Sequence, residues 1–253
     1  MEREKPRYSH AGPRDDHRND PEFLVPLRER VKTPEQEKLY EFLQDEIEYI
    51  RRELALDVKF EDERMRDPLP NKIVHEVLNR IAVKAREFSD HYGGYKVGGV
   101  LIGLRKPTAA DPNPWVVMFD ANTRPSQNVR KHCAEQYLLD RADAAQRDRQ
   151  LENVVALFVV APPRDMPDDP VGLKDDVSQK KQITLTPCEL CRARIGHMAE
   201  EPGGIVNPRY TEIITARSDV ENLALRKMFK AGDQRVFHGE ALSPEYTPIG
   251  GDD

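Results

Sequence analysis

The chain has 253 residues, of which 33% are charged and 38% hydrophobic, and its formal net charge is −6. No apolar run approaches the roughly 18 residues of a membrane-spanning helix, so we expect no membrane partner. The acidic balance argues against broad, phosphate-driven binding of nucleic acid. Hydrophobic content this low predicts that part of the chain lies outside a packed core.

The N-terminal region carries most of the negative charge, because residues 1–70 contain 14 basic and 19 acidic side chains. Residues 1–32 are predicted to be a disordered tail, since large apolar side chains are nearly absent from their first twenty positions. The polar, mixed-charge start of the chain is unlike a secretory signal, and three cysteines are an odd number for disulfides. We therefore expect a reducing, cytoplasmic environment.

An amphipathic arm is predicted over residues 33–70. Its helix, over 33–54, begins with Thr33 as the N-cap, Pro34 in the first turn and Gln36 at the third position. Apolar residues then recur at helical spacing: Leu39, Phe42, Leu43, Ile47, Ile50 and Leu54. This stripe packs either on the chain's own core or on a second subunit.

Helices and strands alternate over residues 71–230, which predicts a single α/β domain followed by an irregular tail over 231–253. A Pro- and Asp-rich loop at 162–182 interrupts the alternation. The expected elements are a helix at 71–89, a strand at 95–104, a returning hairpin strand at 115–119, a helix at 131–149, a strand at 154–160, a short helix from Cys188, a strand at 210–215 and a helix at 220–229.

All three cysteines lie in two short motifs, Cys133-Ala134-Glu135 and Pro187-Cys188-Glu189-Leu190-Cys191, and each motif is predicted to begin a helix. Three protein ligands leave the fourth position of a tetrahedral zinc ion open for water. A carboxylate two residues from a ligand can stand beside the metal and carry a proton. At a helix N-terminus we also expect the pKa values of Cys188 and Cys191 to be depressed.

A ligand-x-Glu motif followed by Pro-Cys-x-x-Cys resembles the zinc deaminases, specifically the cytidine deaminase family in the branch whose first ligand is Cys. The resemblance implies a three-layer α-β-α fold with a central mixed sheet. It also implies that Cys133, Cys188 and Cys191 bind zinc, that Glu135 shuttles protons, and that the backbone near Ala134 holds the base.

Two further positions carry the resemblance. Tyr95-Lys96-Val97-Gly98-Gly99 is similar to the first strand of the family, and Asn122 lies eleven residues before Cys133, as the family's ribose-contacting Asn does. The resemblance implies that Tyr95 packs on the substrate and Asn122 contacts its sugar. Family members are dimers or tetramers, so a homo-oligomer is expected, with the helix at 33–54 as an added candidate interface.

The chain departs from the family at three places. Arg124 stands where the family has a ribose-binding Glu, and an arginine binds phosphate or carboxylate instead, unless it faces solvent in a rebuilt loop. Gln136 replaces the Arg that commonly donates to the thiolates, a loss that Arg192 or Arg130 can compensate. The loop at 162–182 lengthens the spacing between the two cysteine motifs. It could form a lid, select a substrate or bind a neighbouring subunit, and the alternative is a passive surface insertion.

These features predict a zinc-dependent hydrolase that converts the 4-amino group of a small cytosine nucleoside, nucleotide or modified cytosine to the uracil form with release of ammonia. Nucleic acid is the less favoured substrate. The alternatives are a polynucleotide cytosine deaminase and a non-catalytic zinc-fold interaction protein. A structural zinc site with His132 or His197 as fourth ligand would leave the placement of Glu135 unexplained.

Overall fold

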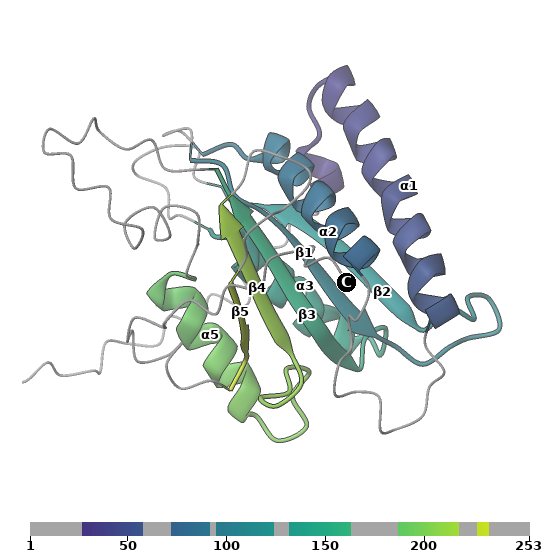
Figure 1. Ribbon diagram of the computed structural model, residues 1–253, viewed down its shortest axis with the longest axis vertical. Coiled ribbons are helices and arrows are strands. Elements are labelled where there is room, and N and C mark those ends of the chain that lie inside the picture. The colour runs from purple at the N-terminus through teal and green to yellow at the C-terminus, as the bar shows by residue number, and fades with distance from the viewer. Residues whose placement is uncertain are drawn as a thin grey trace, which may run out of the picture.

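The structure is a computed structural model that describes residues 27–57, 72–91, 95–123, 132–162, 187–217 and 227–232. Its centre is a mixed five-stranded sheet of order β2-β1-β3-β4-β5, in which β3 and β4 are parallel and the other neighbours antiparallel. The strands are β1 (Gly98–Leu104), β2 (Trp115–Ala121), β3 (Asn153–Ala161), β4 (Glu212–Arg217) and β5 (Lys227–Lys230) (Figure 1).

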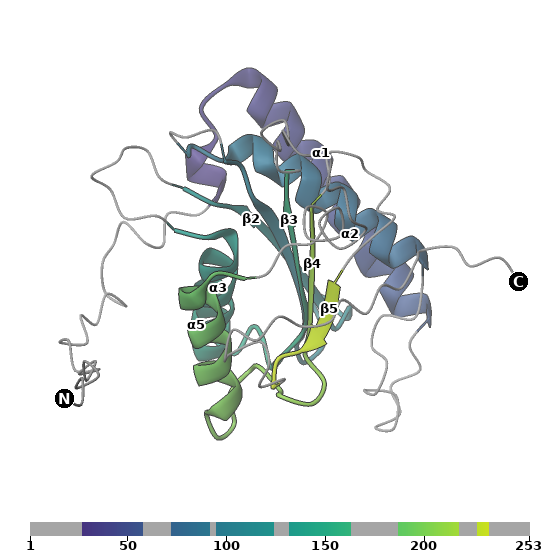
Figure 2. The same ribbon diagram turned by 60° about the vertical axis from the view of Figure 1, so that its left-hand side comes forward.

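Helices cover both faces of the sheet, as the predicted three-layer α/β fold requires, so that prediction is confirmed. One face carries α1 and α2, and the other carries α3 and α5 (Figure 2). The helical elements are the 3₁₀ turn η3 (Leu27–Arg30), α1 (Pro34–Asp57), α2 (Lys72–Ala85), the 3₁₀ turn η5 (Arg86–Phe88), α3 (Ala134–Arg147) and α5 (Glu189–Glu200). None of the helices described is long and apolar enough to cross a membrane.

The sheet separates two hydrophobic cores. Under α1 and α2, the core contains Phe119 and Phe158 from the sheet. Under α3 and α5, it contains Leu101, Leu157 and Leu138. Alternate strand residues point to opposite faces, so the buried strand β3 supplies both cores in turn.

The apolar stripe of α1 packs in the chain's own core. Leu43 and Ile50 are fully buried, and Ile47 and Leu54 are nearly so. The helix begins as the sequence indicates. The backbone amide of Gln36 donates to Thr33 Oγ1 at 3.2 Å, and the side-chain Oε1 of Gln36 accepts from the Lys32 backbone amide at 2.9 Å. Most of the stripe therefore packs within this chain, while Phe42 stays exposed, and a role of the helix in an interface stays a prediction.

Replacement of Ile50 by Ala is expected to lower the free energy of unfolding by about 2–5 kcal/mol, because it leaves a cavity under α1. Phe42→Ala on the same helix is the control, since Phe42 is 38% exposed; it should cost about 1 kcal/mol or less. Urea titration measures both, and equal midpoints would show that α1 is not part of the cooperative core.

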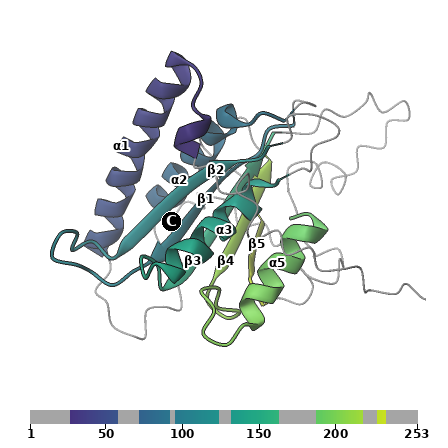
Figure 3. The same cartoon turned by 180° about the vertical axis from the view of Figure 1, so that it is seen from behind.

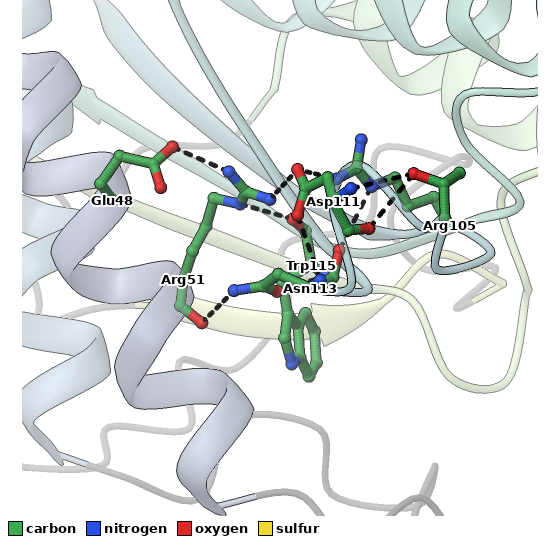
Figure 4. Close-up of polar contacts among 7 residues, drawn as sticks. Glu48, Arg51, Arg105, Asp111, Asn113 and Trp115 are labelled. Atoms are coloured by element: carbon green, nitrogen blue, oxygen red, sulfur yellow. Dashed lines mark hydrogen bonds and ion pairs between the residues drawn. The ribbon is translucent and has the colours of Figure 1, made fainter.

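A polar network joins α1 to the hairpin between β1 and β2 (Figure 4). Arg51 on α1 donates through Nε to the Trp115 carbonyl at 2.8 Å and through Nη2 to Asp111 Oδ2 at 2.7 Å. In return, Asn113 Nδ2 donates to the Arg51 carbonyl at 3.0 Å. Arg105 also pairs with Asp111, so two arginines hold one carboxylate.

The hydrogen bond from Arg51, with a further one from Arg105, lowers the pKa of Asp111 from 3.8 to about 2. A carboxyl whose pKa is lowered by folding stabilises the fold above its unfolded pKa and loses that contribution as pH falls through its folded pKa. We expect Asp111→Asn to cost about 0.5–1 kcal/mol at pH 7, a value kept small because water screens this partly exposed pair. The difference in urea midpoint from the unsubstituted chain should shrink between pH 4 and pH 2; a pH-independent difference would contradict it.

The structure differs from the sequence prediction at two elements. Residues 227–230 form strand β5, antiparallel to β4, so the predicted helix over 220–229 is wrong at its C-terminal end. Met228 and Phe229 pair with Ile214 and Ile213, and this pairing overrides the helical spacing. Strand β1 begins at Gly98 and not at Tyr95. The segment before it is held by Asn122, whose side chain bonds Val97 and Tyr95 and whose backbone amide donates to the Val97 carbonyl at 3.0 Å.

Several predictions lie outside the described residues. They are the loop at 162–182 beyond Pro162, the tail up to residue 26 and the C-terminal segment after Gly232. Residues 27–30, within the predicted tail, form η3.

Candidate metal centre

The two cysteine motifs begin two helices on the same face of the sheet. Cys133 is the N-cap of α3 and Cys188 the N-cap of α5, both with extended backbone, and Cys191 lies one turn into α5. The predicted placement of both motifs at helix starts is therefore confirmed. Figures 2 and 3 show α3 and α5 lying beside each other on the face opposite α1 and α2.

The three sulfur atoms converge. Cys188 Sγ lies 3.5 Å from Cys133 Sγ and 3.3 Å from Cys191 Sγ, and all three lie within 4.8 Å of one another. Sulfur atoms that bind zinc at about 2.3 Å in a tetrahedral arrangement are about 3.8 Å apart, so the observed spacing fits a zinc site. All three cysteines are free thiols.

The cluster contains thiols alone. Neither His132 nor His197 joins the metal-ligating group found in the described part of the chain. His132 packs edge-on against the ring of Tyr137, and His197 pairs with Glu201. Three ligands without a fourth protein donor are the arrangement of an open zinc site.

The thiols of Cys133 and Cys191 have raised pKa values. Hydrogen bonding with Cys188 raises the pKa of the Cys133 thiol to about 12, and burial and the charge of Glu135 contribute. Hydrogen bonds with Cys133 and Cys188, burial and Glu135 likewise raise the pKa of Cys191. The expected depression of the Cys191 pKa is therefore wrong, because the neighbouring thiols, burial and Glu135 all raise it. A divalent cation would reverse this balance, since it binds the thiolate forms.

Glu135 lies in the first turn of α3 and is 4% exposed. Its charge contributes to the raised pKa values of the Cys133 and Cys191 thiols, and in the chain it follows Cys133 by two residues. It is not a member of the converging ligand group. Ala134, one residue before it, is fully buried at the start of the helix.

Gln136 and Arg192 were expected to donate hydrogen bonds to the thiolates, but the bonds described for them involve the backbone at the two helix starts. Gln136 Oε1 accepts a hydrogen bond from the Cys133 amide at 3.2 Å, so Gln136 fixes the backbone at the N-cap. Arg192 donates its amide to the Cys188 carbonyl at 2.9 Å. The Arg192 Nε is buried and has no hydrogen-bond partner among the residues described. Donation by either side chain to the sulfur atoms stays a prediction.

Asn122 is fully buried, and its side chain holds the segment that carries Tyr95. Oδ1 accepts from the Val97 amide at 2.7 Å and from Ser89 Oγ at 2.8 Å, while Nδ2 donates to the Tyr95 carbonyl at 2.8 Å. Tyr95 itself is partly buried against the core under α3. Asn122 therefore anchors Tyr95, whether or not it also contacts a sugar.

Asn122→Ala is expected to lower the free energy of unfolding by about 1–3 kcal/mol, because it removes buried hydrogen bonds to the Val97 amide and the Tyr95 carbonyl. Ser89→Ala removes one bond of the same set and should cost about 1 kcal/mol. Thermal and urea unfolding test both variants. Unchanged stability in Asn122→Ala would mean that the residue serves a substrate only.

The sequence did not indicate a role for Thr123, Tyr137 or Arg30, which the structure brings together. Tyr137 OH bonds Thr123 Oγ1 at 2.8 Å, and the Arg30 guanidinium lies 4.8 Å from the centroid of the Tyr137 ring. Arg30 comes from η3, whose sequence carries no motif, so only the folded chain reveals this contact. Arg124 and Arg130 lie outside the described residues.

Of the comparisons with family models, curated proteins and solved structures, the last gives a match. No family model matches the chain, and no curated protein matches it. Among solved structures, the chain is similar to a cytidine deaminase from Burkholderia pseudomallei, at 21% sequence identity and a TM-score of 0.40, over 63% of this chain and 94% of that one.

Proposed function

We propose that this chain is a zinc-dependent hydrolytic deaminase that exchanges the 4-amino group of a cytosine compound for oxygen. The observation that carries the proposal is the convergence of three thiols from two helix starts, with the buried Glu135 in the first turn of one of these helices. The motif resemblance supports the same reaction, because its metal ligands and its proton-carrying glutamate fall on these residues.

In this proposal Cys133, Cys188 and Cys191 hold the zinc ion, which as a Lewis acid makes water a nucleophile near neutral pH. Glu135 accepts a proton from the water and delivers protons to N3 of the base and to the departing amine. Cytosine and water thereby give the uracil form and ammonia. Burial of Glu135 suits this role, because a carboxylate shielded from bulk water has fewer competing proton donors.

The proposed substrate is a small cytosine nucleoside or nucleotide in the cytoplasm. Tyr95 would pack against the nucleoside from a position fixed by Asn122, and the backbone at Ala134 would hold the base. Arg124 would bind an acidic group such as a phosphate. The active form would be a homodimer or homotetramer that assembles through surfaces other than the buried stripe of α1.

Metal analysis and an ammonia-release assay test the proposal. We expect about one zinc per chain and turnover of at least one of cytidine, deoxycytidine or their phosphates. Faster turnover of the phosphates would support the role of Arg124. Deamination of a single-stranded oligonucleotide alone would favour the polynucleotide alternative, and bound zinc without turnover of any of these compounds would favour a non-catalytic protein.

A further inference from the structure

Strand β2 is an edge of the sheet, so one side of its backbone faces outward. The Arg105 amide bonds the Pro114 carbonyl at 2.8 Å, which fixes the alternation of the antiparallel ladder. Residues 116, 118 and 120 therefore bond to β1, while the amides and carbonyls of 115, 117, 119 and 121 point away from the sheet.

This edge has the composition of a pairing strand. Trp115-Val116-Val117-Met118-Phe119 is uncharged, contains no proline and consists of residues with high β-propensity, apart from Met118. Such segments add to other strands when their backbone groups are free. Natural proteins commonly protect an edge of this kind with charged side chains.

Three arginines from three different elements occupy the outward carbonyls of this edge. Arg51 of α1 donates to the Trp115 carbonyl at 2.8 Å (Figure 4). Arg141 of α3 donates to the Phe119 carbonyl at 2.9 Å. Arg30 of η3 donates to the Ala121 carbonyl at 3.3 Å.

The outward amides at the two ends of the strand are also occupied. Asn113 Oδ1 accepts from the Trp115 amide at 2.9 Å, and Asp120 Oδ1 accepts from the Ala121 amide at 2.7 Å. The buried Asp120 carboxylate pairs with both Arg30 and Arg141, so it holds the two guanidinium groups in place. A new strand would have to break these charge-assisted bonds before it could pair.

We propose that the outer edge of β2 is a pairing edge held closed by Arg30, Arg51 and Arg141, and that its partner when opened is the same edge of a second copy of this chain. The segment 115–119 supplies the apolar, uncharged strand that such a pair needs on both sides. Helix α1 lies along the β2 side of the sheet in Figures 1 and 3, which brings Arg51 to this edge. The homo-oligomer proposed above would use another surface.

The test uses the full chain with Arg51→Met, which keeps much of the aliphatic length and removes the donors to Trp115 and Asp111. Arg52→Met is the matched control, because Arg52 is the next residue, is exposed and donates to Glu48 of its own helix. Both variants lose one positive charge. Sedimentation velocity over a concentration series should show self-association strengthened at least about tenfold by Arg51→Met and unchanged by Arg52→Met.

A second substitution identifies the surface. The backbone amide of Val117 points away from β1 and gives no ladder bond, so Val117→Pro removes a donor that an added strand would use. Combined with Arg51→Met, it should restore the mass of the unsubstituted chain. Circular dichroism of Val117→Pro alone checks that the fold tolerates the proline.

Hydrogen exchange gives an independent measurement if the proline disturbs the fold. In the further associated Arg51→Met species, the amides of Val117 and Phe119 should become protected relative to the unsubstituted chain. Equal masses for Arg51→Met and Arg52→Met would overturn the proposal. Association that leaves these two amides unprotected, or that Val117→Pro does not reverse in a folded chain, would overturn it as well.

Discussion

Glu135→Gln is expected to lower turnover about a thousandfold or more while the zinc content stays at that of the unsubstituted chain. The reason is that the amide keeps the shape of the side chain beside the thiols but cannot accept and return a proton, and general acid–base catalysis contributes about 10²–10⁴-fold. Ammonia release under saturating substrate measures turnover, and metal analysis of the same sample measures zinc.

Glu200→Gln is the control for the change of charge, because Glu200 is exposed in the last turn of α5. It should retain the turnover of the unsubstituted chain. Full activity in Glu135→Gln would remove the proposed proton carrier and with it the mechanism. Loss of zinc in the same variant would instead show that the carboxylate supports the metal site.

Cys191→Ser is expected to abolish zinc binding, from about one ion per chain to less than about a tenth, because a hydroxyl is a poor substitute for a thiolate ligand. Zinc at about a thousand times its dissociation constant adds about 4 kcal/mol to stability. The variant should therefore melt roughly 10 °C below the zinc-loaded protein, at a few degrees per kcal/mol for a chain of this size.

Treatment with a chelator separates the loss of metal from the loss of packing at this fully buried residue. Stripped of zinc, the unsubstituted chain should melt close to the variant, and chelator should leave the variant unchanged. Cobalt substitution adds a readout without activity, since thiolate-bound cobalt has a charge-transfer absorption that the variant should lack. A variant that keeps its zinc would show that Cys191 is not a ligand.

The sequence predicted those parts of the fold and site whose cause is local. Thr33 and Gln36 cap the start of α1, and Cys133 and Cys188 begin α3 and α5, because capping depends on residues within one turn. The long apolar run of β3 was equally clear, since a strand buried on both faces needs no alternation.

The parts that depend on distant contacts were not predictable. Strand β5 is four residues long and exists through its pairing with β4, so its own spacing could not distinguish it from a helix. The anchoring role of Asn122 depends on Tyr95 and Ser89, which lie 27 and 33 residues away along the chain. Resemblance could assign Asn122 to a substrate, but only the folded chain shows its backbone partners.

The division of the interior by the sheet has a consequence for how this sequence can diverge. Substitutions under α1 and α2 change stability, so selection acts on them through the abundance of the folded protein. Substitutions under α3 and α5 also move the helix starts that bring the thiols together, so under the proposed function selection on them would act through turnover. We expect natural relatives to vary more freely on the first face, with Arg30 as an exception because it reaches Tyr137 on the second.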